Sequence, residues 1–256
     1  MPQIITVNSF RRAVGRSSLV ANLGTLLARR GLRVGVIDAD FQGPCQHLLF
    51  DLDARQIQHT LNDFLWGKCA ITEVSIDISK QVKCKSPGKL ILVPASTDVN
   101  DVLRILRAPF DVDRFNEGLR QLSKAHQLDF ILLDTSAGLN ENTLLSMALA
   151  NSLIIMLRPD KQDYQGTAVT IEVAQGLGAP CQYIIMNETP HNLDIENARK
   201  QLETTYQCQV GALLPHSEAL ASLASGGILA VEVPVDPYIK QLKEMADKIA
   251  EKTVPR

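Results

Sequence analysis

The sequence has almost no net charge, few cysteines and no long apolar run. Over 256 residues, 26 Lys and Arg nearly balance 28 Asp and Glu, for a formal net charge of −2. That balance gives no overall attraction to nucleic acid or to an anionic membrane. No apolar run approaches the ~20 residues of a membrane-spanning helix, and the first residues lack the pattern of a signal peptide. We therefore expect a cytoplasmic protein without a membrane-spanning segment.

The cysteines are too few and too scattered for a disulfide framework or a zinc site. There are five, an odd number, and no two of them have C-x-x-C spacing. Such usage indicates reduced thiols in a cytosolic protein, with structural roles. They are Cys45, Cys69, Cys84, Cys181 and Cys208.

Strand-like and helix-like segments alternate along the whole chain. Short apolar runs predict strands at residues 4–8, 33–38, 90–93, 129–134, 152–157, 182–187 and 210–214. Apolar stripes at helical spacing predict helices at residues 17–30, 57–66, 98–107, 111–127, 140–150, 162–177, 192–205 and 237–252. This alternation predicts an α/β fold in which one doubly wound, mostly parallel sheet carries helices on both faces. No shift in composition divides the chain, so we expect a single domain over residues 1–256.

Polar residues follow four of the predicted strands. They are the loop 9–18, Asp38 with Asp40, Asp134 at the end of "FILLD", and Asn187 after "YIIM". Ligands of doubly wound sheets bind at the carboxyl ends of the strands, where a helix N-terminus also attracts anions. Taken alone, each feature also fits a structural role as a turn residue or a helix cap. In the loop, that cap would be Ser17 or Ser18. Together, in this order, they predict a nucleotide site.

The stretch "SFRRAVGRSSL" (residues 9–19) stands where a phosphate-binding loop of the form G-x-x-x-x-G-K-[ST] belongs. Phe10 occupies the position of the leading glycine, and Arg16 occupies that of the lysine. Backbone N–H groups of such a loop hold phosphates, and a hydroxyl such as that of Ser17 holds Mg²⁺.

On these residues the chain resembles the MinD/ParA family of deviant Walker-A P-loop ATPases over nearly its whole length. The matching stretches are "SFRRAVGRSSLVANLG", "RVGVIDADFQGP", "FILLDTSAGLNENTLL", "RPDKQDYQGTAV", "YIIMNE" and "LLPHSEALA". The first and fourth look closest to a MinD-like subgroup of photosynthetic and related bacteria. The resemblance implies a SIMIBI-like P-loop NTPase fold, with ATP or ADP and Mg²⁺ bound between the protomers of a homodimer.

The resemblance also implies roles for individual residues. The implied catalytic set is Arg11, which matches the basic residue that reaches across the dimer, Asp40, which orients water, and Arg16. The implied nucleotide contacts are Arg12, Ala13, Val14, Gly15, Arg16, Ser17 and Ser18 in the loop, Asn187 at the adenine, and Pro215 and His216 beside the base. For Mg²⁺, Ser17 and Asp134 match the family's ligands, and Asp38 ends a strand where it can address the metal's water shell.

The chain also departs from the family pattern. The family loop reads basic-Gly-Gly-x-Gly-Lys-[ST], whereas Arg12 and Ala13 here replace glycines that permit positive φ. Arg16 keeps a positive charge, but a guanidinium is not interchangeable with an ammonium. Ser136 replaces the proline often found after the second acid. Because the acids remain while the loop is degenerate, we predict that hydrolysis is weak or lost.

Three functions therefore stay open. The leading one is a nucleotide-dependent dimeric switch; the others are a pseudo-ATPase scaffold that works through protein partners, and an active ATPase that positions cargo on DNA or membrane. Lys80, Lys83, Lys85 and Lys89 form either a solvated surface loop or a weak patch for an acidic surface. The mixed charges of residues 237–252 favour a helix packed on the domain over a membrane anchor.

Overall fold

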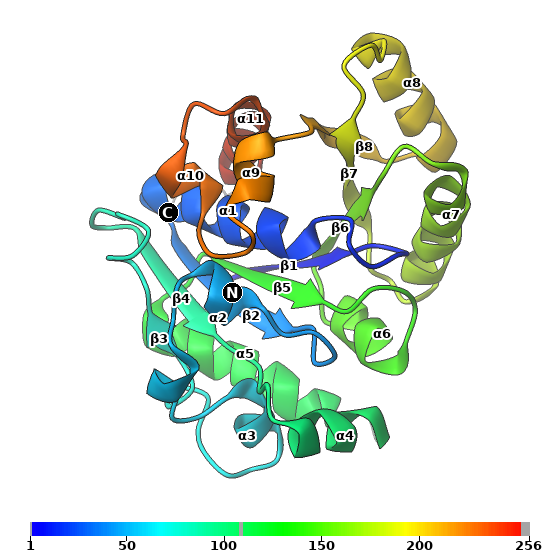
Figure 1. Cartoon of the computed structure of the whole chain (residues 1–256). Helices are drawn as coiled ribbons and strands as arrows, with labels where there is room; N and C mark the ends of the chain where they lie inside the picture. Colours follow the sequence, from blue (N-terminus) through cyan, green and yellow to red (C-terminus); the bar gives the residue numbers. More distant parts are fainter. Residues whose placement is uncertain (1, 108–109, 252–256) are drawn as a thin grey trace.

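Eight strands form one sheet in the order β3-β4-β2-β5-β1-β6-β7-β8 (Figure 1). This computed structural model describes residues 2–107 and 110–251. Neighbouring strands are parallel except β3 and β4, which are antiparallel at one edge. The strands are β1 (Gln3–Asn8), β2 (Arg33–Ala39), β3 (Ile76–Asp77), β4 (Lys89–Val93), β5 (Phe130–Thr135), β6 (Ser152–Leu157), β7 (Cys181–Thr189) and β8 (Gln209–Pro215).

Helices cover both faces of the sheet (Figure 1). The longer ones are α1 (Arg16–Arg29), α4 (Val99–Arg107), α5 (Val112–His126), α6 (Glu141–Ala148), α7 (Lys161–Gly176), α8 (Ile195–Tyr206) and α11 (Pro237–Glu251). The shorter ones are α2 (Gln46–Leu49), α3 (Leu61–Leu65), α9 (Glu218–Ser222) and α10 (Leu229–Glu232), with a 3₁₀ turn at Ala54–Gln56.

Successive side chains of a strand point to opposite faces of the sheet. Because helices cover both faces, the strands are buried on both sides. On β5, Phe130 and Leu132 belong to the core that contains α1 and α11. Ile131 and Leu133 belong to the opposite core, which contains α5. A third core joins β6 and β7 to α7 and α8. Burial on both faces explains why these strands are continuous apolar runs in the sequence.

The predicted fold class is confirmed, and the differences are local. The predicted helix at 57–66 is only α3, because a capping box between Thr60 and Asp63 starts it late. The edge strand β3 and the helices α2, α9 and α10 were not predicted, since two to five residues carry too little periodicity. Residue 252, the last of the predicted helix 237–252, lies outside the described residues.

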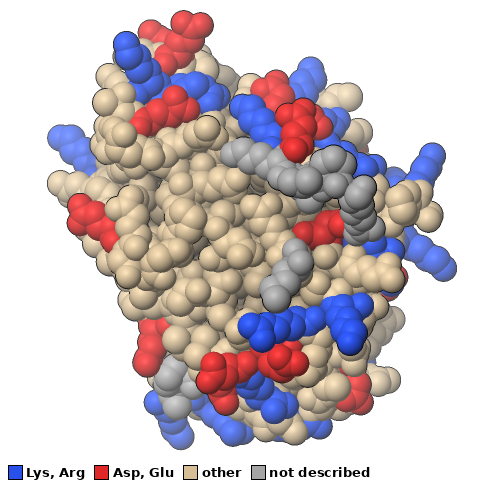
Figure 2. Space-filling model, turned by 180° about the vertical axis from the view of Figure 1, so that it is seen from behind, with Lys and Arg blue, Asp and Glu red and all other residues tan. Residues whose placement is uncertain are grey.

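The last helix, α11, packs on the sheet as expected. Its apolar side chains, among them Ile239, Leu242 and Met245, are buried in the core that also contains α1. In the described part of the chain, no helix is long and apolar enough to cross a membrane. On the face seen in Figure 2, basic and acidic side chains are mixed around the edge, and a broad central area carries neither.

Candidate functional site

The carboxyl ends of β1, β2 and β5 meet at one edge of the sheet, beside the start of α1 (Figure 1). β1 leads into loop 9–15, while Asp38 and Asp134 stand in register on β2 and β5. Asp40 follows β2 directly. The topology therefore brings together the loop and the three acids that the sequence singles out.

The loop ends in a conformation suited to an anion. Gly15 is left-handed, with φ of 98°, and α1 begins at the next residue, Arg16. No side chain caps this helix, so its first N–H groups are available to an anion. The alternative reading of Ser17 or Ser18 as an N-cap is wrong, because both lie inside the first turn.

Arg12 and Ala13, which replace two glycines of the family loop, have different effects on the structure of the loop. Ala13 adopts a φ of 59°, a left-handed conformation that costs an L-residue about 1 kcal/mol. The strain expected from the missing glycines therefore falls on Ala13. Arg12 donates a hydrogen bond through Nη2 to Oε1 of Gln42, in the turn after β2. Its guanidinium thus joins the loop to the residues that follow Asp40.

Asp38 and Asp134 are both fully buried. Asp38 Oδ2 accepts hydrogen bonds from the backbone N–H groups of Cys45 (2.9 Å) and Gln46 (3.0 Å), and its Oδ1 accepts one from Asp40 N (3.2 Å). Burial, followed by the charge of Asp134, raises the pKa of Asp38 well above its ordinary value. Burial also raises the pKa of Asp134 to about 6, against the opposing effects of Arg16 and Gln46.

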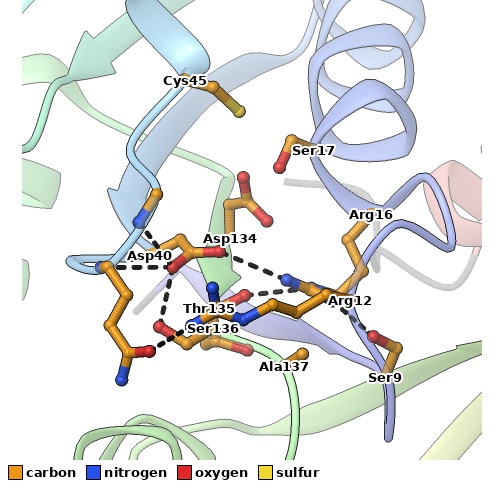
Figure 3. Close-up of polar contacts among 12 residues, drawn as sticks. Ser9, Arg12, Arg16, Ser17, Asp40, Cys45, Asp134, Thr135, Ser136 and Ala137 are labelled. Carbon is orange, nitrogen blue, oxygen red and sulfur yellow. Dashed lines mark hydrogen bonds and ion pairs between the residues drawn. The ribbon is translucent and has the colours of Figure 1, made fainter.

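The surroundings of Asp134 fit a hydrated cation. Its Oδ2 accepts a hydrogen bond from Gln46 Nε2 at 2.8 Å, whereas its buried Oδ1 has no partner among the described residues. Ser17, on the first turn of α1, lies beside this carboxylate (Figure 3). The described residues contain no cluster of three or more His, Cys, Asp or Glu for a metal. Mg²⁺ needs no such cluster, because it keeps waters and binds through one or two carboxylates and phosphates.

The guanidinium of Arg16 is buried and joins three parts of the site (Figure 3). It donates to Thr135 O at 3.0 Å, to the hydroxyl of Ser9, and to Asp40 Oδ2 at 3.3 Å. The other oxygen of Asp40, Oδ1, accepts a hydrogen bond from the hydroxyl of Ser136 at 2.8 Å. Two departures from the family pattern, at positions 16 and 136, therefore hold the same carboxylate.

Residues 10 and 11 attach the loop to α7. The ring of Phe10 packs so closely over Gly166 that a Cβ there would lie 2.0 Å from it. Arg11 pairs with Asp160 and with the buried Asp163, whose Oδ1 lies 2.5 Å from Arg11 Nε. The hydrogen bond with Asp163 is the main cause that raises the pKa of Arg11. The residue expected to reach across a dimer is held within its own chain.

The residues expected beside the base lie at the ends of β7 and β8. Asn187 Nδ2 donates to Val14 O at 2.8 Å, so this buried amide braces the loop. His216 Nδ1 lies 2.7 Å from Oε2 of Glu188, and Pro215 ends β8 next to it. Contact of Asn187, Pro215 and His216 with adenine stays a prediction.

The lysine cluster lies at the opposite end of the sheet. Lys89 is the first residue of β4 and pairs with Asp77 at 3.1 Å. Lys80, Lys83 and Lys85 are exposed in the turn before it. Binding to an acidic surface through this turn stays a prediction.

Several residues of the site were not predicted. Gln46 contacts Asp134, Ser9 binds Arg16, and Asp163 binds Arg11. The only signal for Asp163 was its place in "RPDKQDYQGTA". Ser9 lies in the predicted loop 9–18, but nothing in the local pattern marks it or Gln46 for these contacts, because polar residues at turns are common.

A family profile described as "AAA domain" matches residues 2–178. An uncharacterized ATP-binding protein of Methanocaldococcus jannaschii is 26% identical over 96% of this chain and 86% of its own length. The septum site-determining protein MinD of Synechocystis is 31% identical over 62% of this chain and 54% of its own length. Among solved structures, MinD of Pyrococcus horikoshii, complexed with Mg-ADP, superposes with a TM-score of 0.81 at 20% identity, covering all of both chains.

Proposed function

Because this chain belongs to the MinD/ParA family of P-loop ATPases, we propose that it is a dimeric switch that binds ATP at loop 9–18 and hydrolyses it weakly. The Methanocaldococcus jannaschii relative is named an ATP-binding protein, and the Pyrococcus horikoshii MinD structure contains Mg-ADP. The observation that carries the proposal concerns Arg16. This residue occupies the position of the phosphate-binding lysine, but its buried guanidinium forms an ion pair with Asp40.

Nucleotide binding is supported by the uncapped start of α1 and by the buried acids. The phosphates would lie against the N–H groups that follow Gly15, where the helix dipole also favours negative charge. Ser17 and Asp134 would hold Mg²⁺, and this cation would give the unpaired Asp134 Oδ1 a counter-charge. When bound, Mg²⁺ neutralises charge on the β- and γ-phosphates.

Weak hydrolysis is supported by the contacts of Asp40. A carboxylate that orients an attacking water must offer it an accepting lone pair. Here Oδ2 of Asp40 faces Arg16, and Oδ1 accepts from the Ser136 hydroxyl at 2.8 Å. Oδ1 also accepts longer hydrogen bonds from the backbone N–H groups of Gln42 (3.3 Å) and Gly43 (3.2 Å). In turn, the Arg16 guanidinium donates to Thr135 and Ser9, so it is not directed at a transferring phosphate. The ion pair thus directs the Arg16 guanidinium and the Asp40 carboxylate toward each other, rather than toward a phosphate and an attacking water.

The second candidate is a pseudo-ATPase scaffold that needs no nucleotide. The intrachain contacts of Arg11 favour it, because a residue held by Asp160 and Asp163 contributes nothing across a dimer. The two candidates differ in whether ligand binding changes stability and association.

Mg-ATP and Mg-ADP are expected to raise the melting temperature. A ligand that binds only the folded state stabilises it by RT ln(1 + [L]/Kd), which gives about 5 °C or more at a hundredfold excess over Kd for a chain of this size. Differential scanning fluorimetry with each nucleotide, with and without Mg²⁺, measures the shift. A flat response to both nucleotides at millimolar concentration rejects the switch and leaves the scaffold.

Two opposite variants test the intrachain ion pair. Arg11→Ala should weaken an ATP-dependent dimer at least tenfold, whereas Asp160→Asn should strengthen it, because it removes one of the two carboxylates that hold Arg11 while Asn still caps α7. Sedimentation velocity with and without Mg-ATP measures both, and Arg55→Ala is the exposed control. An identical oligomer with and without ATP in the wild type contradicts the coupling of association to nucleotide.

A further inference from the structure

Two of the five cysteines, distant in sequence, meet at the edge of the sheet far from the loop. Cys181 is the first residue of β7, and Cys208 directly precedes β8, the neighbouring parallel strand. They lie 27 positions apart in sequence, yet their Sγ atoms are 2.7 Å from each other. The other three cysteines lie in separate loops, and none of them contacts another cysteine in the described part of the chain.

The position of the pair suits a covalent bond. The sulfurs of a disulfide lie about 2.05 Å apart, so the two thiols need to approach by less than 1 Å. Because both residues stand at the starts of hydrogen-bonded strands, the backbone already holds their side chains together. The proximity of the two sulfurs therefore favours closure to a disulfide.

A surface cavity gives small molecules access to the pair. Its volume is about 680 Å³, and Cys208 forms part of its wall. Cys181 is itself half-buried. Charged groups of both signs line the same cavity: Arg199, Glu203, Lys248 and Glu251. Such a wall is complementary to a small molecule that carries both carboxylates and an ammonium group, as glutathione does.

We propose that Cys181 and Cys208 are a reversible redox site that closes to a disulfide by exchange with a low-molecular-weight disulfide. The Cys208 thiolate attacks one sulfur of the small disulfide and releases the first small thiol. The Cys181 thiolate then attacks the mixed disulfide at Cys208 and releases the second. The small disulfide gains two electrons, and the two protons of the protein thiols end on the two released thiols.

The disulfide would join the start of β7 to the start of β8, so that α8 lies within the cross-linked loop. A cross-link of this span restricts the unfolded chain and so stabilises the folded one. The hydrogen bond with Cys208 and burial both raise the pKa of Cys181, which keeps the thiolate scarce and the exchange slow near neutral pH. The pair therefore closes slowly, because its second step needs the Cys181 thiolate.

The test incubates the wild-type chain with oxidised glutathione at about pH 8, where thiolates are more abundant, and records the intact mass and a non-reducing peptide map. We expect the loss of two hydrogens, a cross-link between the peptides of Cys181 and Cys208, and reversal by dithiothreitol. The oxidised chain should melt roughly 10 °C higher than the reduced one.

Variants separate this pair from the remaining thiols. Cys181→Ser should stop at one glutathione on Cys208, and Cys208→Ser should form no cross-link, while neither gains thermal stability. Cys84→Ser, the matched control, should behave like the wild type. Glutathione that stays attached to the wild type without a cross-link, a cross-link between other cysteines, or an unreactive pair each overturns the proposal.

Discussion

Single-turnover phosphate release is expected to rise about 100-fold when one variant restores the loop and removes the Arg16 guanidinium and the Ser136 hydroxyl from Asp40. The variant combines Arg12→Gly, Ala13→Gly and Arg16→Lys with Ser136→Pro. The glycines relieve the positive φ at Ala13 and detach the loop from Gln42. The lysine restores an ammonium that can meet the phosphates.

The fourth change matters because Ser136 holds Asp40 independently of Arg16. The three loop changes alone leave Oδ1 of Asp40 bonded to the Ser136 hydroxyl, so they should recover only part of the gain. Single changes should recover less, since residues that act as a unit are strongly non-additive. Comparing the triple and quadruple variants isolates the contribution of Ser136.

Two controls accompany this experiment. Asp40→Ala in the quadruple variant should abolish the gain, while Arg55→Lys, on an exposed arginine, should leave wild-type release unchanged. Wild-type release as fast as that of the quadruple variant would mean that Arg16 serves as a phosphate ligand after all. The interpretation of a disabled loop would then be wrong.

Asp134→Asn is expected to raise the free energy of unfolding by about 3 kcal/mol at pH 8 without Mg²⁺. The pKa of Asp134 is about 6 in the folded chain and about 3.9 in an unfolded one. The folded state therefore binds the proton more tightly. The wild type loses stability as the pH rises from about 4 to about 6, and the loss is complete above that range.

The asparagine variant carries no charge at this buried position, so its stability should change less between about pH 4 and pH 6. Urea unfolding at about pH 5 and pH 8, in buffer with EDTA, measures the difference. Glu117→Gln, which removes an exposed carboxylate, is the matched control. With Mg-ATP the order should reverse, because only the wild type can bind the cation through Asp134. Lower stability of Asp134→Asn at both pH values would contradict the assignment of a buried charge whose desolvation outweighs the stabilising effects of Arg16 and Gln46.

Much of the candidate site could be predicted from local sequence. "FILLD" and "VIDAD" each end a run of apolar residues with an acid, and the carboxyl ends of parallel strands share one edge of the sheet. The position of the loop between a strand and a helix follows from the same local pattern. The edge strand β3 and the short helices α2, α9 and α10 could not be predicted in this way, because their few residues show no period.

The sequence by itself determined the α/β fold, the family resemblance, and the presence of the loop and its acids at one edge of the sheet. Only the tertiary structure decided which side chains meet there: Arg16 and Ser136 at Asp40, and Arg11 at Asp163. It also brought together Cys181 and Cys208, which lie 27 positions apart in the sequence. The physical reason is that periodicity reports which face of its own element a residue occupies. Contacts between residues 24 to 152 positions apart depend instead on strand order, register and side-chain direction.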